Sequence, residues 1–394
     1  MKRVTLVLSV LLVLGLLAGC GGGGSGTSNG GNNGAPAPVA PAAATQFLYV
    51  SDTNGELFGF SVDAKSGVLS PIRSGNPMDV VGGGFGGVVR IASDPNGNNL
   101  YVARAALDKG DNLMVLFLMP DGSGNLGTWS DLGQALTIPP GKLAVDPSSK
   151  NLYVIPDPSA KLNEILSFSI APGSPHSPHL VALSTPVTGV SGVPTDITVD
   201  PSGHYVYVTF AGAPGMQIAG YSRDQTTGAL TNLPSSPFGN TGGKDSQGIM
   251  STPSGAFAAI ANAATNDVSV MSLKTGTLTN ISGSPFPAGA SPLSVAIDPS
   301  SKFVFVANQG DNTLSAYAMG PDGGLTPISG SPFTVGSQPQ GVTVDLSGKF
   351  AYVASADGNV WGFTLNTGTG SLTPITGSPF HANGTLRDIV VLKP

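Results

Sequence analysis

Charged side chains are scarce in this chain, yet several recur at one position of a repeated segment. Only 10% of the 394 residues are charged. Each repeat contains a short aliphatic stretch that usually ends in Asp. The position four residues before that Asp lies at the beginning of the stretch in every repeat. In chain order this position is occupied by Arg90, Lys142, Asp196, Gly248, Ser294, Gly341 and Asp388. A carboxylate can activate water and a cation can stabilise an oxyanion, so this set predicts a site for acid–base or anion-binding chemistry.

A second polar set follows the aromatic stretch of the repeats. Its members are Asp52, Arg104, Asn262 and Asn308, and Arg387 lies next to Asp388 in the chain. For a hydrolytic reaction, the candidate catalytic residues are Arg90, Arg104, Asp196 and Asp388, the arginines as cations and the aspartates as bases. The candidate ligand-binding residues are Asp52, Lys142, Asn262, Asn308 and Arg387. The alternative interpretation is that these are solvated charges at loop ends that form weak ion pairs of ~0–1 kcal/mol.

The elements that must position these residues are strands of a repeated unit. The central aromatic position of the repeat is occupied by Tyr49, Tyr101, Tyr153, Tyr207, Ala259, Phe305 and Tyr352, at intervals of 46 to 54 residues. A period of ~40–50 residues with only strand-like patterns inside it is typical of a β-propeller with one repeat per blade. The sequence therefore predicts an all-β fold, a seven-bladed β-propeller of four-stranded blades over residues 45–394.

Strand direction explains why the two polar sets are expected to meet. Adjacent strands run antiparallel, so the start of the first strand and the end of the second strand lie on one face of the disc. Blades 1 to 4 should bring their charges to one rim, whereas blades 5 to 7 are nearly neutral there. A central cleft of this kind suits a small anionic or sugar-like ligand.

The two ends of the repeat array predict how the ring closes. Residues 47–50 (Phe-Leu-Tyr-Val) read as a second strand with no first strand before it. Residues 387–392 (Arg-Asp-Ile-Val-Val-Leu) read as a first strand with nothing after it. We therefore expect the C-terminal strand to complete blade 1 and close the ring, which would remove exposed sheet edges.

The N-terminal residues predict export and anchoring. Lys2 and Arg3 precede an apolar run that ends in Leu-Ala-Gly-Cys at residues 17–20, as in a signal peptide. This ending resembles the bacterial lipobox, so we expect residues 1–19 to be removed and Cys20 to be lipidated. Residues 20–44 are rich in Gly, Ser, Pro and Ala and are expected to form a disordered tether. The predicted location is extracytoplasmic, on the bacterial cell envelope, either in the periplasm or at the cell surface.

Composition excludes several classes of function. A formal net charge of −6 with no basic patch argues against a nucleic-acid partner. The lipid anchor is the only expected contact with the membrane. Cys20 is the only cysteine, so no intramolecular disulfide can form. We expect no cofactor, no metal site and a monomer whose partner is a small ligand or an envelope protein.

The recurring (Tyr/Phe)-Val-Ala-Asn phrase, the Asp-Pro-Ser-Gly turn and the Gly-x-Leu-Thr-Pro strand resemble the lactonase-type, or YVTN-repeat, seven-bladed propellers. This family includes phosphogluconolactonase-like and carboxymuconate-cyclase-like members. The resemblance implies a lactone hydrolase or a muconate-type cycloisomerase, and for the cyclase-like members a His/Arg/Glu cluster. The chain has four histidines and, in Glu56 and Glu164, only two glutamates. That thin supply favours a non-catalytic binding or interaction module, with the lactonase or cycloisomerase as the alternative.

Overall fold

The structure is a computed structural model, and it describes most of the chain after residue 45. The described residues are 46–73, 89–95, 97–104, 111–118, 122–128, 135–136, 139–171, 179–183, 192–212, 217–239 and 243–393. The chain divides into two units, Met1–Pro41 and Ala42–Pro394, and only the second contains described residues. No helix among the described residues is long and apolar enough to cross a membrane.

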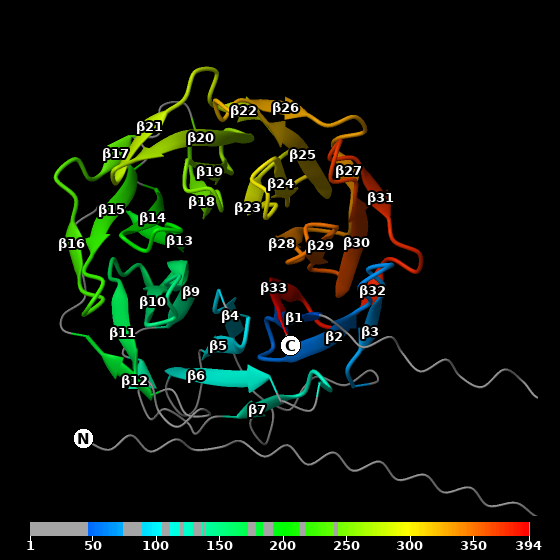
Figure 1. Cartoon of the computed structure of the whole chain (residues 1–394), viewed down its shortest axis with the longest axis horizontal. Coiled ribbons are helices and arrows are strands. Elements are labelled where there is room, and N and C mark those ends of the chain that lie inside the picture. Colours follow the sequence, from blue (N-terminus) through cyan, green and yellow to red (C-terminus); the bar gives the residue numbers. More distant parts are fainter. Residues whose placement is uncertain are drawn as a thin grey trace, which may run out of the picture. The chain divides into compact units, whose positions relative to one another are not determined.

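The described residues form an all-β propeller, as the sequence predicts. They build seven antiparallel sheets arranged around a central axis (Figure 1). We number the sheets by chain order. Sheet 1 holds β1 to β3 and β33, sheet 2 β4 to β8, sheet 3 β9 to β12, sheet 4 β13 to β17, sheet 5 β18 to β22, sheet 6 β23 to β27 and sheet 7 β28 to β32.

The innermost and second strands of each sheet carry the two polar sets. The innermost strands, from sheet 1 to sheet 7, are β33 (Leu386–Leu392), β4 (Val89–Ser93), β9 (Pro140–Val145), β13 (Val193–Val199), β18 (Ser246–Ser251), β23 (Pro292–Ile297) and β28 (Pro339–Val344). The second strands are β1 (Gln46–Asp52), β5 (Asn99–Arg104), β10 (Asn151–Pro156), β14 (Tyr205–Ala211), β19 (Phe257–Asn262), β24 (Phe303–Asn308) and β29 (Phe350–Ser355).

In each sheet the third strand is longer than the fourth. The third strands are β2 (Leu57–Val62), β6 (Asp111–Leu118), β11 (Leu166–Ala171), β15 (Gln217–Arg223), β20 (Asp267–Lys274), β25 (Thr313–Met319) and β30 (Asn359–Leu365). The fourth strands are β3 (Leu69–Pro71), β7 (Leu126–Thr128), β12 (His179–Ala182), β16 (Leu230–Asn232), β21 (Thr277–Asn280), β26 (Leu325–Pro327) and β31 (Leu372–Pro374). One 3₁₀ helix, η1 (Pro158–Ala160), follows β10.

Among the described residues, the prediction of four strands per sheet holds for sheets 1 and 3 and is wrong for the other five. These five carry an additional two-residue strand on the third strand: β8 (Ala135–Leu136), β17 (Phe238–Gly239), β22 (Phe286–Pro287), β27 (Phe333–Thr334) and β32 (Phe380–His381). The fourth strand covers only the later part of the third strand. The extra strand pairs with the earlier part, where backbone groups would otherwise lack partners.

The repeated Ser-Pro-Phe sequence builds this extra strand in four sheets. Its Phe begins β17, β22, β27 and β32. Its Ser hydroxyl accepts a hydrogen bond from the third strand, for example from the Ala316 N–H to Ser331 Oγ at 2.9 Å. The same bond joins Gly362 to Ser378 at 2.9 Å. The motif therefore completes the outer edge of a sheet rather than forming a site.

The core lies between neighbouring sheets. One apolar cluster joins Leu48 and Phe60 of sheet 1 to Tyr352 and Val360 of sheet 7. The C-terminal strand β33 pairs antiparallel with β1, with Tyr49 opposite Val390. The first and last described strands therefore belong to one sheet, with β33 innermost.

Candidate functional site: a charged cluster at the centre of the propeller

A β-bulge sets the direction of the side chains at the start of the innermost strands. In β9, β13, β18, β23, β28 and β33 the pairing with the second strand shifts by one residue. In β13, for example, Asp196 pairs with Thr209 and Pro194 pairs with Phe210, so Thr195 is the extra residue. A bulge interrupts the ladder and re-aims the side chains beside it. In these six strands the predicted polar position lies at this irregularity, whereas the described pairing of β4, which carries Arg90, shows no shift.

Side chains at this position reach the next innermost strand. Asp196 Oδ2 accepts the N–H of Ile249 at 2.9 Å, and Asp388 Oδ2 accepts the N–H of Ile91 at 3.3 Å. Ser294 Oγ accepts the N–H of Val342 at 3.3 Å. These hydrogen bonds give the three residues a structural role, because a buried backbone N–H needs an acceptor.

The structure brings five of the predicted residues together with one other, Asp157. We call Arg90, Lys142, Asp157, Asp196, Arg387 and Asp388 the central cluster. Lys142 Nζ donates a short hydrogen bond to Asp388 Oδ1, and Arg90 Nη1 lies 3.6 Å from the same oxygen. The Asp388 side chain is only 4% exposed, whereas that of Lys142 is 31% exposed. The Lys142 side chain is therefore the member of this ion pair that a ligand can reach.

The pKa values of the two aspartates on the innermost strands are shifted in opposite directions. Burial raises the pKa of Asp196, although the charge of Lys142 and the N–H of Ile249 oppose the rise. Burial would also raise the pKa of Asp388, but the charges of Lys142 and Arg90 and the hydrogen bonds from Lys142 and the Ile91 N–H lower it below its ordinary value. Two neighbouring carboxyls with diverging pKa values are the arrangement that separates an acid–base group from a permanently charged one.

The remaining members of the cluster surround Arg90. Arg90 Nη2 lies 3.6 Å from Asp157 Oδ2. Arg387 is close enough to Arg90 that burial and this second guanidinium lower the pKa of Arg387, while Asp388 and Asp157 oppose the change. Asp157 was not predicted as a site residue. It follows β10, where Pro156 and Asp157 stand in place of the single Asn found at the end of β19 and β24.

The side chains of the second polar set mostly form hydrogen bonds within their own hairpins. Asn308 Nδ2 donates to Thr313 Oγ1 and Ser315 Oγ, both at 2.9 Å. Asn262 Nδ2 donates to Asp267 Oδ1 at 2.7 Å and to Ser269 Oγ at 2.9 Å.

In sheet 1, Asp52 Oδ1 accepts the N–H groups of Asn54 and Glu56 at 2.9 and 2.7 Å. Within the described part of the chain, no ion pair joins Asp52 to the central cluster. Arg104 ends β5 and pairs across the strands with Val89.

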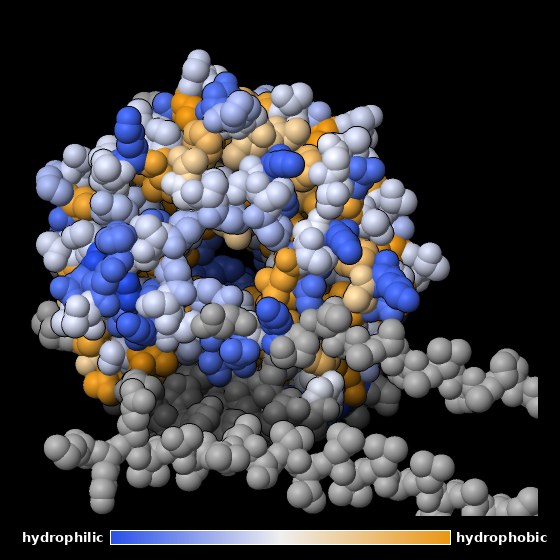
Figure 2. Space-filling view, in the orientation of Figure 1, coloured by the Kyte–Doolittle hydropathy of each residue, from blue (hydrophilic) through white to orange (hydrophobic). Residues whose placement is uncertain are grey.

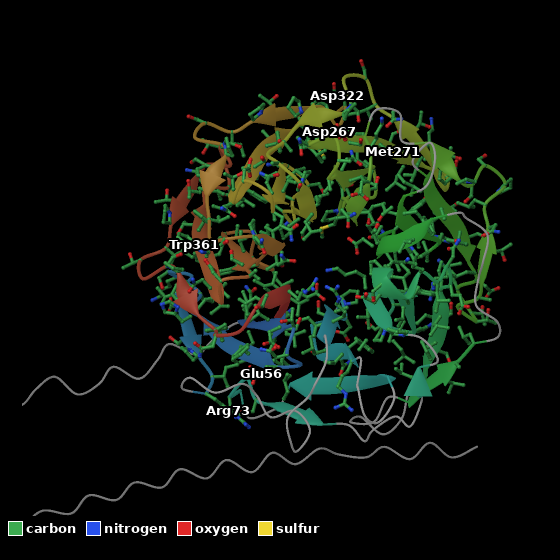
Figure 3. All side chains as sticks on the ribbon, turned by 180° about the vertical axis from the view of Figure 1, so that it is seen from behind. Glu56, Arg73, Asp267, Met271, Asp322 and Trp361 are labelled. Carbon is green, nitrogen blue, oxygen red and sulfur yellow. The ribbon has the colours of Figure 1, made fainter. Side chains whose placement is uncertain are left out.

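Hydrophilic side chains gather at the centre of the ring. Figure 2 shows a hollow there with hydrophilic residues inside it. In Figure 3 the labelled Arg73 and Asp322 lie at the outer edge instead. His204 contacts Ser202, with Nδ1 2.9 Å from Oγ, in the turn between β13 and β14, and His381 is exposed on β32. No group of three His, Cys, Asp or Glu suited to a metal ion occurs among the residues that the structure covers.

Known proteins with this architecture include lactonases. Residues 252–386 match the family "Lactonase, 7-bladed beta-propeller". The resemblance read from the repeated motifs is thereby confirmed over this part of the chain. No curated protein matches the sequence.

Solved lactonase-type propellers have the same fold as this chain. A putative 6-phosphogluconolactonase from Bacteroides fragilis superposes with a TM-score of 0.71 at 16% identity, over 89% of this chain and 98% of that one. A second, from Bacteroides uniformis, gives 0.71 at 14% identity over 89% and 100%. The periplasmic gluconolactonase PpgL of Pseudomonas aeruginosa gives 0.67 at 17% identity over 88% and 99%. At such identities the likeness concerns the fold, and activity has to be argued from the site.

Proposed function

We propose that this chain is a lactone hydrolase whose active site is the central cluster. The observation that carries the proposal is the pair of carboxyls, Asp196 and Asp388, with diverging pKa values beside one accessible ammonium, Lys142. Lactone hydrolysis needs a base for water and a cation for the oxyanion. The cluster supplies both without a histidine or glutamate, so the shortage that favoured a binding module no longer counts against catalysis.

In the proposed reaction, the Asp196 carboxylate takes a proton from water as the oxygen attacks the lactone carbonyl carbon. Lys142 stabilises the negative charge that forms on the carbonyl oxygen. The ring C–O bond then breaks, the proton on Asp196 passes to the leaving alkoxide, and a hydroxy acid results. Asp388 stays ionised and holds Lys142 in place. Removal of a general base lowers rates by about 10²–10⁴-fold.

The test follows acid release from a panel of sugar and aliphatic lactones by the purified full-length protein. Asp196→Asn keeps an acceptor for the Ile249 N–H and removes the charge, and Lys142→Met removes the cation. Asp224→Asn is the control, because Asp224 is an exposed turn residue that accepts the N–H of Thr226 at 2.9 Å. We expect both site variants to lower kcat by at least ~100-fold and the control to match the wild type.

Two results would contradict the proposal. One is the absence of turnover on every lactone from protein shown to be folded. The other is turnover that survives both site substitutions, which would move the active site elsewhere in the molecule.

A non-catalytic binding module is the second candidate. It is favoured by the hydrogen bonds of Asp196, Ser294 and Asp388 to the next innermost strand, a role that requires no chemistry. In that case the cluster would bind a small anionic or sugar-like ligand, or an envelope protein. Calorimetric binding of a hydroxy acid such as gluconate without turnover of its lactone would favour this candidate.

We also propose that the seven sheets are the blades of one closed ring. Support comes from the pairing of β33 with β1 and from the apolar cluster between sheets 7 and 1. Removal of residues 386–394 should then abolish cooperative unfolding rather than loosen one sheet. Unchanged cooperativity after the truncation would contradict a closed ring.

We further propose that the protein is an exported lipoprotein, acylated at Cys20 after removal of residues 1–19 and held at the cell envelope by the tether 20–44. Gln46 lies at the opposite end of β1 from Asp52, and its side chain bonds to Asp345. Cys20→Ser should move the protein from the membrane fraction to the soluble fraction, and unchanged fractionation would contradict acylation.

A further inference from the structure

Asp157 occupies a place where sheet 3 departs from the repeat. In sheets 5 and 6 the second strand ends in an Asn that holds its own hairpin. In sheet 3 the chain instead passes through Pro156 and Asp157 into η1. This departure carries a carboxylate beyond the end of the strand and toward Arg90 of sheet 2.

Hydrogen bonds within sheet 3 and η1 hold the Asp157 carboxylate in place independently of Arg90. Its Oδ1 accepts the Ser159 N–H at 3.0 Å and the Ser159 hydroxyl at 2.6 Å, as the N-cap of η1. Its backbone N–H donates to the Pro139 carbonyl at 2.8 Å. Only Oδ2 remains for Arg90, at 3.6 Å from Nη2. The orientation of this carboxylate is therefore set by sheet 3 and not by Arg90.

Arg90 links Asp157 to the rest of the central cluster. Its Nη1 lies 3.6 Å from Asp388 Oδ1, the oxygen that also accepts the hydrogen bond of Lys142. Arg387 stands beside Arg90, and Asp157 is one of the two negative charges that act on both. Without Asp157, two neighbouring guanidinium groups would share Asp388 with Lys142. Like charges at close range repel, so both arginines would move away from one another and from their present positions.

We propose that Asp157 is a positioning residue of the central cluster, which holds Arg90 in place and thereby fixes Arg387 and the Asp388–Lys142 pair. This proposal rests on the proposed function for its catalytic consequence, because Asp157 itself touches no reacting atom. Its effect on the two arginines does not depend on that function. The two parts are therefore tested by separate measurements.

The first measurement is chemical labelling of arginine by phenylglyoxal, quantified for Arg90 and Arg387 by mass spectrometry of the full-length protein. The reagent attacks the neutral guanidine. Removal of the Asp157 charge favours the neutral form of Arg387, since Asp157 opposes the lowering of its pKa. We expect Asp157→Asn to raise the labelling rate of Arg387 by roughly three- to tenfold, because the guanidinium loses the carboxylate that holds it and its charge in place.

The second measurement is turnover of a lactone that the wild type hydrolyses. Asp157→Asn should lower kcat/KM roughly tenfold, as a misplaced neighbour of the reacting groups does. Asp157→Glu, which keeps the charge, should recover part of the loss. Asp224→Asn is the matched control because Asp224 also accepts the N–H two residues ahead, in a turn remote from the arginines, and should change neither measurement.

The outcomes separate the two proposals. Wild-type labelling rates in folded Asp157→Asn protein would overturn the positioning role, whatever the activity. Raised labelling with unchanged kcat/KM would overturn its catalytic consequence. If the wild type turns over no lactone, the proposed function fails alone, and raised labelling still supports the positioning of the arginines by Asp157.

Discussion

Lys142 Nζ donates a hydrogen bond to Asp388 Oδ1 across 246 positions of the chain. The two residues belong to β9 of sheet 3 and β33 of sheet 1. Arg90 of sheet 2 contacts the same carboxylate oxygen. One carboxylate from the C-terminal strand thus ties together the innermost strands of three sheets. The same contact leaves the ammonium of Lys142 available at the centre of the propeller.

Substitution of Asp388 should lower stability in a pH-dependent way. Asp388→Asn leaves two cations without their shared carboxylate, which we expect to cost roughly 2 kcal/mol of unfolding free energy at pH 7. The pKa of Asp388 is lowered in the folded protein. Its stabilising contribution is therefore present above the ordinary carboxyl pKa of about 3.9 and is lost as the pH falls further. Urea unfolding at pH 7 and pH 3 should show a larger loss at pH 7, and an equal loss at both would contradict the assignment.

Substitution of Asp196 should have the opposite pH dependence. The pKa of Asp196 is raised in the folded protein, so the folded state binds the proton more tightly than the unfolded state. The stability contributed by this proton is present at low pH and lost as the pH rises through the raised pKa. The unfolding free energy of Asp196→Asn relative to wild type should therefore increase between pH 3 and pH 7. A decrease over this range would show that Asp196 behaves like Asp388.

The same raised pKa predicts the pH profile of the enzyme. A general base acts only when it is deprotonated. We expect kcat/KM for a lactone to rise with pH through a pKa above the ordinary carboxyl value and then to reach a plateau. Initial rates in buffers from pH 4 to pH 8 measure this. A profile that falls over the same range would assign Asp196 the role of an acid instead.

Two buried tyrosines provide a matched test of the contact between sheets 7 and 1. Tyr352 Oη donates to the Gly67 carbonyl at 2.7 Å, across these two sheets. Tyr207 is equally buried, yet its hydroxyl has no hydrogen-bond partner in the part of the chain that the structure describes. Tyr352→Phe should cost about 1 kcal/mol of unfolding free energy, and Tyr207→Phe should be neutral or slightly stabilising. Equal effects of both in urea unfolding would contradict the assigned hydrogen bond.

A buried ion pair joins sheets 3 and 4 away from the central cluster. Arg223 Nη2 lies 3.0 Å from Asp146 Oδ2, and Arg223 Nε donates to Tyr153 Oη at 3.0 Å. Arg223→Met should lower the unfolding free energy by about 3 kcal/mol, because Asp146 stays buried without its cation. Lactone turnover should be unchanged per folded molecule. Arg73→Met, at the exposed outer edge (Figure 3), should change stability by less than ~0.5 kcal/mol.

The sequence could predict the strands and much of the site because both are written in the repeat. The turn Asp298, for instance, accepts the N–H groups of Lys302 and Phe303, both at 2.7 Å, as its place in the Asp-Pro-Ser turn indicates. Arg90, Lys142, Asp196 and Asp388 share one position of the repeat, so rotation about the axis brings them together. The extra strand at Phe238 could not be predicted as readily, because a strand of two residues is too short to show an alternating pattern.

Asn262 and Asn308 show that residues predicted to lie on one face need not form one site. They lie at the predicted ends of their strands, but their amides bond within their own hairpins. The Asn-x-x-x-x-Thr spacing at Asn308 could have indicated this local contact. Asp157 was missed because it follows an irregular strand end, although Asp-Pro-Ser at residues 157–159 is itself a capping signal.

The repeated pattern of strands and turns, and the types of charge at the innermost position, follow from the sequence alone, because they depend on local periodicity and turn chemistry. Tertiary structure decided which carboxyl stays ionised. Asp388 faces two cations and its pKa falls, whereas the half-buried Asp196 faces one and its pKa rises. That difference depends on the residues that neighbouring sheets place around each carboxyl, and strand periodicity holds no information about them.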